Sequence, residues 1–409
     1  MEKLIGNAIV GQSGGPTAAI NATLSGVIKG ALESDAITKI YGAQNGIEGV
    51  LARRLIDLSE MTEDDLSLLE TTPAAALGSC RKKLPADFEG ANRKIFEEIV
   101  EIFKEYDIRY FFYIGGNDSM DTVLKLSRFT KEIGYEMRVM GVPKTIDNDL
   151  AGTDHTPGYG SAAKYIATTM QEILRDTAVY TVKAVTVVEI MGRDAGWLTA
   201  SAAIPSLYSN VAPDLVYLPE VPFNYDEFFE DLEKAFEKHP NVVVAVSEGI
   251  RLADGTYVGE GTQSGVTDAF GHKYLSGTGK ALEIAIKENF GCKVRSVELN
   301  LPQRCASHIA SKTDLYESAA IGRHAVRYAT FGESGKMMIF TRLEGDRYKV
   351  CVDSADIADI ANAVRSVPRE YINERGNNVT EQCLAYIAPL IMGEPEIIYE
   401  NGLPKHFSF

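Results

Sequence analysis

The chain has 409 residues, of which 45% are hydrophobic and 24% charged, and its formal net charge is -16. This length predicts about two to three domains, and the composition is typical of a soluble globular protein. The acidity excludes a nucleic-acid-binding protein that uses a basic face. No apolar run approaches the ~20 residues of a membrane span, so no membrane partner is expected.

The first segment is expected to form a strand and a candidate phosphate-binding turn. The apolar run Leu4–Val10 leads into Gly11–Pro16, and a helix is predicted to begin near Thr17. Backbone NH groups at such a turn, here at Gly14 and Gly15, can bind a phosphate at the start of a helix. The pattern lacks the spacing of a P-loop or a dinucleotide fingerprint, so a plain turn is an equally good interpretation.

A glycine-rich turn follows the strand predicted at Tyr110–Ile114. It contains Gly115, Gly116, Asn117 and Asp118. The glycines suit a phosphate, and the aspartate can bind a divalent cation, because hard cations prefer oxygen ligands. The alternative interpretation is a helix N-cap, which asparagine and aspartate both favour.

The most informative segment follows the strand predicted at Val139–Val142. It places Lys144, Thr145, Asp147 and Asp149 within one short loop. In an extended loop, two carboxylates two residues apart point the same way, so one can orient a hydroxyl while the other takes its proton. The lysine adds a charge that suits a phosphoryl group. Phosphoryl transfer is therefore favoured over a plain Asp-rich turn.

A second series of strands also ends in polar residues. Met191, Gly192 and Arg193 follow one strand, Glu248 follows another, and Arg304 lies beyond a third. The glutamate can hold hydroxyl groups, and the arginines can bind a phosphomonoester through paired hydrogen bonds. Candidates for a locally basic, multi-phosphate site are Arg81, Lys82, Lys83, Lys144, Arg193, Arg251, Arg295 and Arg304.

The alternation of strands and helices predicts an α/β fold with two Rossmann-like α/β/α domains and mostly parallel sheets. The other strands are predicted at 39–43, 185–190, 215–218, 242–246 and 294–299, and helices at 91–106, 225–238 and 279–289. The glycine-rich stretch 152–160 is expected to separate the domains. Residues 251–275 are interpreted as a hairpin or surface insertion, 337–352 as two antiparallel strands, and the tail as mixed helix and irregular chain.

Taken together, these motifs resemble the 6-phosphofructokinase family from about residue 4 to about residue 350. The matching segments stand in the order Gly14-Gly15, Gly115–Ser119, Pro143–Asp149, Met191–Arg193, Glu248-Gly249 and Gln303-Arg304. The Thr145–Asp149 and Met191–Arg193 segments are together highly specific. The resemblance implies a phosphoryl-donor domain of residues 1–155 plus about 303–355, a fructose 6-phosphate domain of 156–302, and a C-terminal extension of 356–409.

The resemblance also implies roles for individual residues. Asp147 is expected to deprotonate the sugar 1-hydroxyl, Thr145 and Asp149 to hold the sugar and the phosphoryl group, and Arg81 to stabilise the charge on that group. The contacts to fructose 6-phosphate are expected from Met191, Gly192, Arg193, Glu248 and Arg304. Arg295 is similar to an arginine that reaches the sugar phosphate from a neighbouring subunit, which implies a homodimer or homotetramer with shared sites.

Two residues bear on the phosphoryl donor. ATP-using members usually carry glycine where this chain has Asp118 and where it has Lys144. The aspartate would repel the α-phosphate of ATP, and the lysine would add positive charge beside a smaller diphosphate. The pair is therefore similar to the pyrophosphate-dependent branch, with Mg²⁺ held at Asn117 and Asp118. The residues expected to hold the diphosphate are Gly14, Gly15, Gly115, Gly116 and Lys144.

Other functions remain open. An ATP-dependent phosphofructokinase of the same fold is the main alternative, and Asp118 distinguishes it. A catalytically silent regulatory subunit is a third hypothesis, against which Asp147, Arg81 and Lys144 argue. A dinucleotide-linked dehydrogenase is disfavoured because the glycine fingerprint is absent. Five cysteines without paired spacing favour the reducing cytoplasm.

Overall fold

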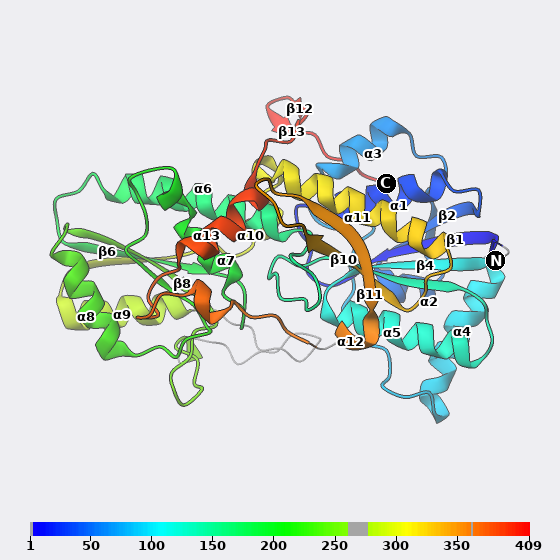
Figure 1. Cartoon of the computed structure of the whole chain (residues 1–409), viewed down its shortest axis with the longest axis horizontal. Helices are drawn as coiled ribbons and strands as arrows, with labels where there is room; N and C mark the ends of the chain where they lie inside the picture. Colours follow the sequence, from blue (N-terminus) through cyan, green and yellow to red (C-terminus); the bar gives the residue numbers. More distant parts are fainter. Residues whose placement is uncertain (1–2, 261–276, 361–362) are drawn as a thin grey trace.

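The computed structural model describes residues 3–260, 277–360 and 363–409. The predicted alternation is confirmed, and most strands belong to two sheets that lie side by side (Figure 1). The strands are β1 (Gly6–Gln12), β2 (Ile37–Ala43), β3 (Leu55–Asp57), β4 (Ile108–Gly115), β5 (Arg138–Pro143), β6 (Ala184–Ile190), β7 (Leu215–Tyr217), β8 (Asn241–Ser247), β9 (Lys293–Glu298), β10 (Lys336–Arg342), β11 (Val350–Asp356), β12 (Tyr399–Glu400) and β13 (Leu403–Pro404).

Helices connect these strands. The α-helices are α1 (Ile20–Leu32), α2 (Gly46–Leu51), α3 (Glu63–Glu70), α4 (Gly90–Glu105), α5 (Asn117–Glu132), α6 (Tyr159–Thr177), α7 (Trp197–Ala200), α8 (Tyr225–Phe236), α9 (Thr278–Phe290), α10 (Pro302–Cys305), α11 (Lys312–Thr330), α12 (Ile357–Ile360) and α13 (Glu381–Ile387). Short 3₁₀ helices are η1 (Ser201–Leu207), η3 (Ser307–Ile309), η4 (Arg369–Tyr371) and η5 (Ala388–Ile391).

The first sheet has the strand order β11-β10-β5-β4-β1-β2-β3. Its centre is parallel, while β3 and β11 pair antiparallel with their neighbours at the two edges. The antiparallel pair expected within 337–352 is thereby confirmed as β10 and β11. Parallel neighbours need crossover connections, and the helices between these strands provide them.

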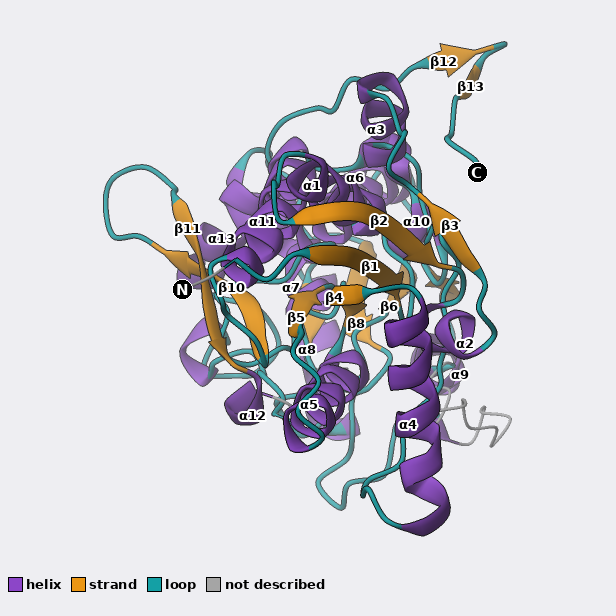
Figure 2. Ribbon diagram, turned by 90° about the vertical axis from the view of Figure 1, so that its right-hand side faces the viewer, coloured by secondary structure: helices purple, strands orange, loops and turns teal. Residues whose placement is uncertain are grey.

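Alternating side chains of β4 show how this sheet builds its core. Tyr110 and Phe112 pack with α1 and α11 on one face, whereas Phe111 and Tyr113 pack with α4 and α5 on the other. All four side chains are buried, and each is worth about 1.5–3 kcal/mol of apolar burial. Figure 2 shows the helices on both faces of the sheet. The continuous apolar run of β4 is thus that of a strand covered on both faces.

The second sheet has the order β7-β8-β6-β9 and is parallel throughout. The helices α8 and α9 cover one face, and α6, α7 and α13 cover the other. Trp197, expected to be a packing residue, is fully buried on the face that α6, α7 and α13 cover. Because the strands of each sheet run parallel, their carboxyl ends bring several loops to one edge, which is where such sheets bind ligands.

Two expectations need correction or restriction. The first helix begins at Ile20 and not near Thr17, because the Thr17 hydroxyl accepts a hydrogen bond from the Ala19 NH (3.2 Å) and extends the turn. The proposed insertion 251–275 begins with an antiparallel bridge between Arg251 and Tyr257, but residues 261–276 lie outside the described residues. In the described part of the chain, no helix is long and apolar enough to cross a membrane.

Candidate active site

A cleft of about 510 Å³ opens between loops that follow strands of both sheets. It is lined by residues from the loops after β1, β4 and β5 of the first sheet and after β6 and β8 of the second. The structure thus brings most predicted site residues together. Those that line the cleft are Gly14, Gly15, Arg81, Gly116, Asn117, Asp118, Lys144, Thr145, Asp147, Asp149, Met191, Gly192, Arg193, Glu248 and Arg304.

The turn after β1 leaves room beside two cationic side chains. Gly14 has a φ of +78°, in the left-handed region that favours glycine. A Cβ there would lie 3.5 Å from the Lys144 Nζ, and a Cβ on Gly15 would lie 3.3 Å from Arg304 Nη1. The Lys144 ammonium donates to the Gly15 carbonyl (2.5 Å). The turn therefore lies beside two cationic side chains, and its left-handed residue at position 14 favours glycine.

The turn after β4 begins helix α5 at Asn117, so Asn117 and Asp118 lie in the first helical turn. The Asp118 carboxylate pairs with the Lys83 ammonium (2.9 Å). The Asn117 Oδ1 atom is buried and has no hydrogen-bond partner within the described residues. This amide oxygen, which accepts no hydrogen bond from the described residues, therefore lies next to a carboxylate on this wall of the cleft.

Gly115 does not line the cleft, contrary to its predicted contact with the diphosphate. It is the last residue of β4 and pairs with Pro143 of β5. A Cβ on Gly115 would lie 2.0 Å from the Ser119 Oγ. The glycine is therefore required by the close packing of the strand end against the start of α5, behind the cleft wall.

The loop after β5 alternates its side chains as the sequence predicts. Asp147 and Asp149 line the cleft, whereas Asn148 between them is completely buried. Asn148 has a φ of +55°, which asparagine tolerates better than most residues. The Asp147 NH donates to the Thr145 hydroxyl (3.1 Å). The left-handed residue is thus part of a tight turn that presents two carboxylates to one side.

Burial shifts the titration of three groups in this loop. It lowers the pKa of the Lys144 ammonium to about 8 and raises the pKa of the Asp149 carboxyl to about 7. It also raises the pKa of Asp147, although the Arg193 guanidinium and Lys144 oppose that shift. Desolvation disfavours the charged form of each of these three groups. Shifts of this kind are typical of functional sites.

On the second sheet, Glu248 holds the loop after β6. Its Oε1 accepts hydrogen bonds from the NH groups of Gly192 (3.3 Å) and Arg193 (3.1 Å). Burial raises the pKa of Glu248 to about 8. A Cβ on Gly249 would lie 1.7 Å from the Arg193 carbonyl oxygen, so only glycine allows the two loops to pack this closely. Arg193 itself has a φ of +51°.

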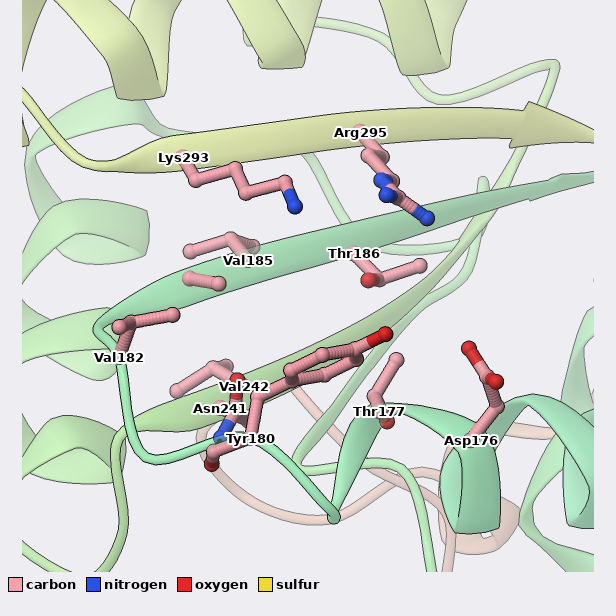
Figure 3. A pocket seen from close by; sticks show the side chains of 11 residues that line it. Asp176, Thr177, Tyr180, Val182, Val185, Thr186, Asn241, Val242, Lys293 and Arg295 are labelled. Carbon is pink, nitrogen blue, oxygen red and sulfur yellow. Dashed lines mark hydrogen bonds between the residues drawn. The ribbon is translucent and has the colours of Figure 1, made fainter.

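Arg295, which was predicted to act on the site of a neighbouring subunit, lies outside the cleft of its own chain. It lies near the start of β9 in a small separate pocket with Asp176, Tyr180 and Lys293, and not in the cleft. Figure 3 shows Arg295 and Lys293 on the same strand, facing this pocket. The carboxyl end of β9 leads to the cleft, whereas Arg295 is near its amino end. In this chain, Arg295 therefore does not contact the site.

The sequence reasoning missed several residues of the cleft. Asp194, Tyr257 and Val364 line it without having been assigned a role, whereas Lys83, which also lines it, was among the basic candidates. The Tyr257 hydroxyl donates to Asp194 (3.2 Å), and the ring lies 4.3 Å from the Arg251 guanidinium. The position of Asp194 directly after Arg193 was a usable signal. Tyr257 and Val364 gave none, since each reaches the cleft through a long-range contact.

The chain belongs to the phosphofructokinase family. The family model described as "Phosphofructokinase" matches residues 7–329. Among curated proteins, the chain is 44% identical to the pyrophosphate--fructose 6-phosphate 1-phosphotransferase of Halomonas elongata, over 98% of this chain and 95% of that protein. It is 39% identical to the protein of the same name from Methylococcus capsulatus, with the same coverage.

A solved structure is also similar over nearly the full length. The pyrophosphate-dependent phosphofructokinase of Nitrosospira multiformis matches with a TM-score of 0.89 and 37% identity, covering 98% of this chain and 95% of that one. The expected α/β fold with mostly parallel sheets and the resemblance to the pyrophosphate-dependent branch are both confirmed by these similarities. Most of the predicted site residues line one cleft, whereas Gly115 and Arg295 lie outside it.

Proposed function

We propose that this protein transfers a phosphoryl group from inorganic pyrophosphate to the 1-hydroxyl of fructose 6-phosphate. The products are fructose 1,6-bisphosphate and phosphate, and the reaction is reversible: in the reverse direction phosphate attacks the 1-phosphoryl group, pyrophosphate forms, and the sugar 1-oxygen leaves and is protonated. The observation that carries the proposal is the cleft itself, in which Asp118 and Lys144 from the first sheet face Arg193 and Glu248 from the second. The names of the full-length relatives support it.

Asp147 acts as the general base. Its carboxylate takes the proton of the sugar 1-hydroxyl as that oxygen attacks the phosphorus atom. Asp149, on the same side of the turn, and Thr145 orient the sugar and the moving phosphoryl group. Bringing the hydroxyl and the donor together in one cleft supplies much of the rate, because positioning dominates phosphoryl transfer.

On the donor side, the cations stabilise the charge that shifts to the leaving phosphate. Lys144, which already contacts the turn at Gly15, lies beside the diphosphate, and Arg81 stabilises the transferring group. Asp118 keeps the larger, more negative ATP out by like-charge repulsion. Arg193 and Arg304 bind the 6-phosphate of the sugar, while Met191, Gly192 and Glu248 complete the sugar site.

Mg²⁺ fits the turn after β4. The buried Asn117 Oδ1 and the Asp118 carboxylate are the oxygen ligands that this cation prefers. Within the described residues, no group of three or more histidine, cysteine or acidic side chains is placed to hold a metal ion. A small number of protein ligands is enough for a Mg²⁺ ion that arrives with a diphosphate, because the diphosphate itself supplies oxygen ligands. When bound, the cation neutralises negative charge of the diphosphate.

The wider assignments follow the same proposal. Residues 1–155 and about 303–355 form the donor domain, 156–302 form the sugar domain, and 356–409 pack on both. The protein is a homodimer or homotetramer in which Arg295 serves the neighbouring subunit's sugar phosphate, since it lies away from the cleft of its own chain. The five cysteines are free thiols, which supports a cytoplasmic location.

The donor is tested by initial rates of fructose 1,6-bisphosphate formation with Mg²⁺ and fructose 6-phosphate. Pyrophosphate is expected to support turnover, whereas ATP at the same concentration is not. Turnover with ATP at a comparable rate would contradict the role given to Asp118 and would favour an ATP-dependent phosphofructokinase. No turnover with either donor would favour the silent regulatory subunit.

A further inference from the structure

The segment after α12 contacts the loop that carries Asp147, and its Val364 lines the cleft. We define residues 363–368 as the crossing segment; they lie beyond the part of the chain matched by the family model. In Figure 1, the orange chain between α12 and α13 runs from the first sheet toward the second. Val364 forms an antiparallel bridge with Leu150, and the Arg365 NH donates to the Asp149 carbonyl (2.8 Å). The crossing segment thus pairs with the active-site loop through one short antiparallel contact.

The Arg365 side chain contacts the same loop at several points. Its Nη1 donates to the carbonyl oxygens of Thr153 (3.3 Å) and Asp154, and it reaches the Asn148 Oδ1 (3.5 Å). Its Nη2 donates to the Tyr386 hydroxyl (3.0 Å). One planar guanidinium therefore ties together both ends of the stretch 148–154, an arrangement that a lysine ammonium does not reproduce.

Tyr386, in α13, completes the arrangement from a distant part of the sequence. Its hydroxyl accepts a hydrogen bond from Asn148 Nδ2 (3.0 Å) and donates to the Asp154 carbonyl (2.6 Å). The Asp154 carboxylate is in turn bound by His155 Nδ1 (2.9 Å) and Arg342 (3.0 Å). The hydroxyl thus holds the buried asparagine against a fixed carbonyl group.

These contacts meet at the strained residue of the active-site turn. Asn148 lies between Asp147 and Asp149 and has a φ of +55°. Such a conformation persists only where the surroundings determine it. The amide of Asn148 has both of its ends engaged, since the Thr156 NH also donates to its Oδ1 (3.0 Å). Rotation of this residue would turn the two flanking carboxylates away from the cleft.

We propose that Arg365 and Tyr386 are positioning residues that hold the Asn148 turn so that Asp147 and Asp149 both face the cleft. They contact the loop behind the cleft wall and act through it. The crossing segment also contacts the other half of the molecule, since the Trp197 Nε1 donates to the Arg365 carbonyl (3.1 Å). The Val367 NH donates to Glu220, which also accepts from the Gly196 NH. The same segment therefore couples the catalytic turn to the loop that follows Arg193.

The test compares Tyr386→Phe with Tyr371→Phe. Tyr371 is the matched control because its ring packs on Trp197 and Tyr386, while its hydroxyl has no hydrogen bond among the described residues. Tyr386→Phe is expected to lower kcat about tenfold, since a displacement of about 1 Å can cost up to 10²-fold, and to leave KM within about twofold. Tyr371→Phe is expected to retain the wild-type kcat.

The kinetic expectation rests on the proposed function, so a second readout is independent of it. Hydrogen exchange of the ligand-free protein is expected to be faster at residues 145–156 in Tyr386→Phe than in Tyr371→Phe. Arg365→Lys, which keeps the charge and loses the fork, is expected to show the same local effect. If hydrogen exchange at residues 145–156 is as slow in both Tyr386→Phe and Arg365→Lys as in the wild-type protein, the proposal is overturned. This conclusion does not depend on which phosphoryl donor the wild-type protein uses.

Discussion

At the level of single residues, the buried lysine of the active-site loop determines how activity responds to alkaline pH. Burial lowers the pKa of Lys144 to about 8, so its positive charge is present below that pH and is lost above it. The base Asp147 must be unprotonated, and burial raises its pKa. The pH profile of kcat/KM reports groups of the free enzyme. We therefore expect a bell shape with an alkaline midpoint near pH 8.

Lys144→Arg tests this assignment. Arginine stays charged throughout the accessible range, so the decline above pH 8 is expected to disappear while the acid limb remains. The measurement is kcat/KM for pyrophosphate across the pH range for both proteins. An alkaline limb at the same midpoint in Lys144→Arg would assign that titration to another group.

Single residues are also expected to determine which phosphoryl donor the protein uses. The double variant Asp118→Gly, Lys144→Gly removes the negative side chain expected to repel the α-phosphate and the charge that favours pyrophosphate. Removal of one like-charge contact that costs about 1.4 kcal/mol corresponds to about a tenfold change in kcat/KM for ATP. We expect the ratio of kcat/KM for ATP to that for pyrophosphate to rise at least about tenfold. An unchanged ratio in steady-state assays would contradict the role given to these residues.

At the level of secondary-structure elements, two loops of the second sheet must pack against each other. A Cβ on Gly249 would lie 1.7 Å from the Arg193 carbonyl oxygen, and backbone cannot yield as a flexible side chain does. Gly249→Ala is therefore expected to displace the 191–193 loop and raise the KM for fructose 6-phosphate about tenfold or more, a loss of about 1.4 kcal/mol of binding. The KM for pyrophosphate serves as the internal control. An equal rise in both KM values would indicate a disturbance of the whole cleft and would contradict this prediction.

The elements that the sequence predicts well are those with a local signal. The continuous apolar run at Tyr110–Ile114 and the polar residues after it locate a buried strand and its ligand-binding turn. The sequence also predicts that Asp147 and Asp149 point the same way, on the assumption of an extended loop. They do line the cleft together, but the structure achieves this with a tight turn at the left-handed Asn148. Gly115 was predicted to be the first residue of the loop and to contact the diphosphate. In the structure it is the last residue of β4 and lies outside the cleft, a difference of one position in the strand boundary.

The remaining parts of the site depend on contacts between distant segments. Arg365 lies 217 positions from Asn148, and Tyr386 lies 238 positions from it. Neither position has a local pattern that indicates a function, since an isolated arginine or tyrosine is common on any surface. The start of α1 was missed by three residues because a Thr17 hydroxyl competes for the backbone NH at that turn.

At the level of the whole molecule, the proposed role of Arg295 requires a second copy of the chain. Arg295 lies in a separate pocket near the start of β9 (Figure 3), so any contact with the sugar phosphate must be made in another subunit. Arg295→Ala is expected to raise the KM for fructose 6-phosphate about tenfold, with the KM for pyrophosphate unchanged. Analytical ultracentrifugation is expected to show a dimer or tetramer. A monomer with full activity would contradict this assignment.

The central claim is that phosphoryl transfer takes place at the loop after β5, with Asp147 as base. The most direct measurement is the kcat of Asp147→Asn with pyrophosphate and fructose 6-phosphate, compared with Asp254→Asn, which changes an exposed aspartate of a surface turn. Asparagine keeps the size of the side chain and loses the base. We expect a fall in kcat of at least about 100-fold with little change in KM, and wild-type values for the control. Near-normal turnover of Asp147→Asn would contradict the account.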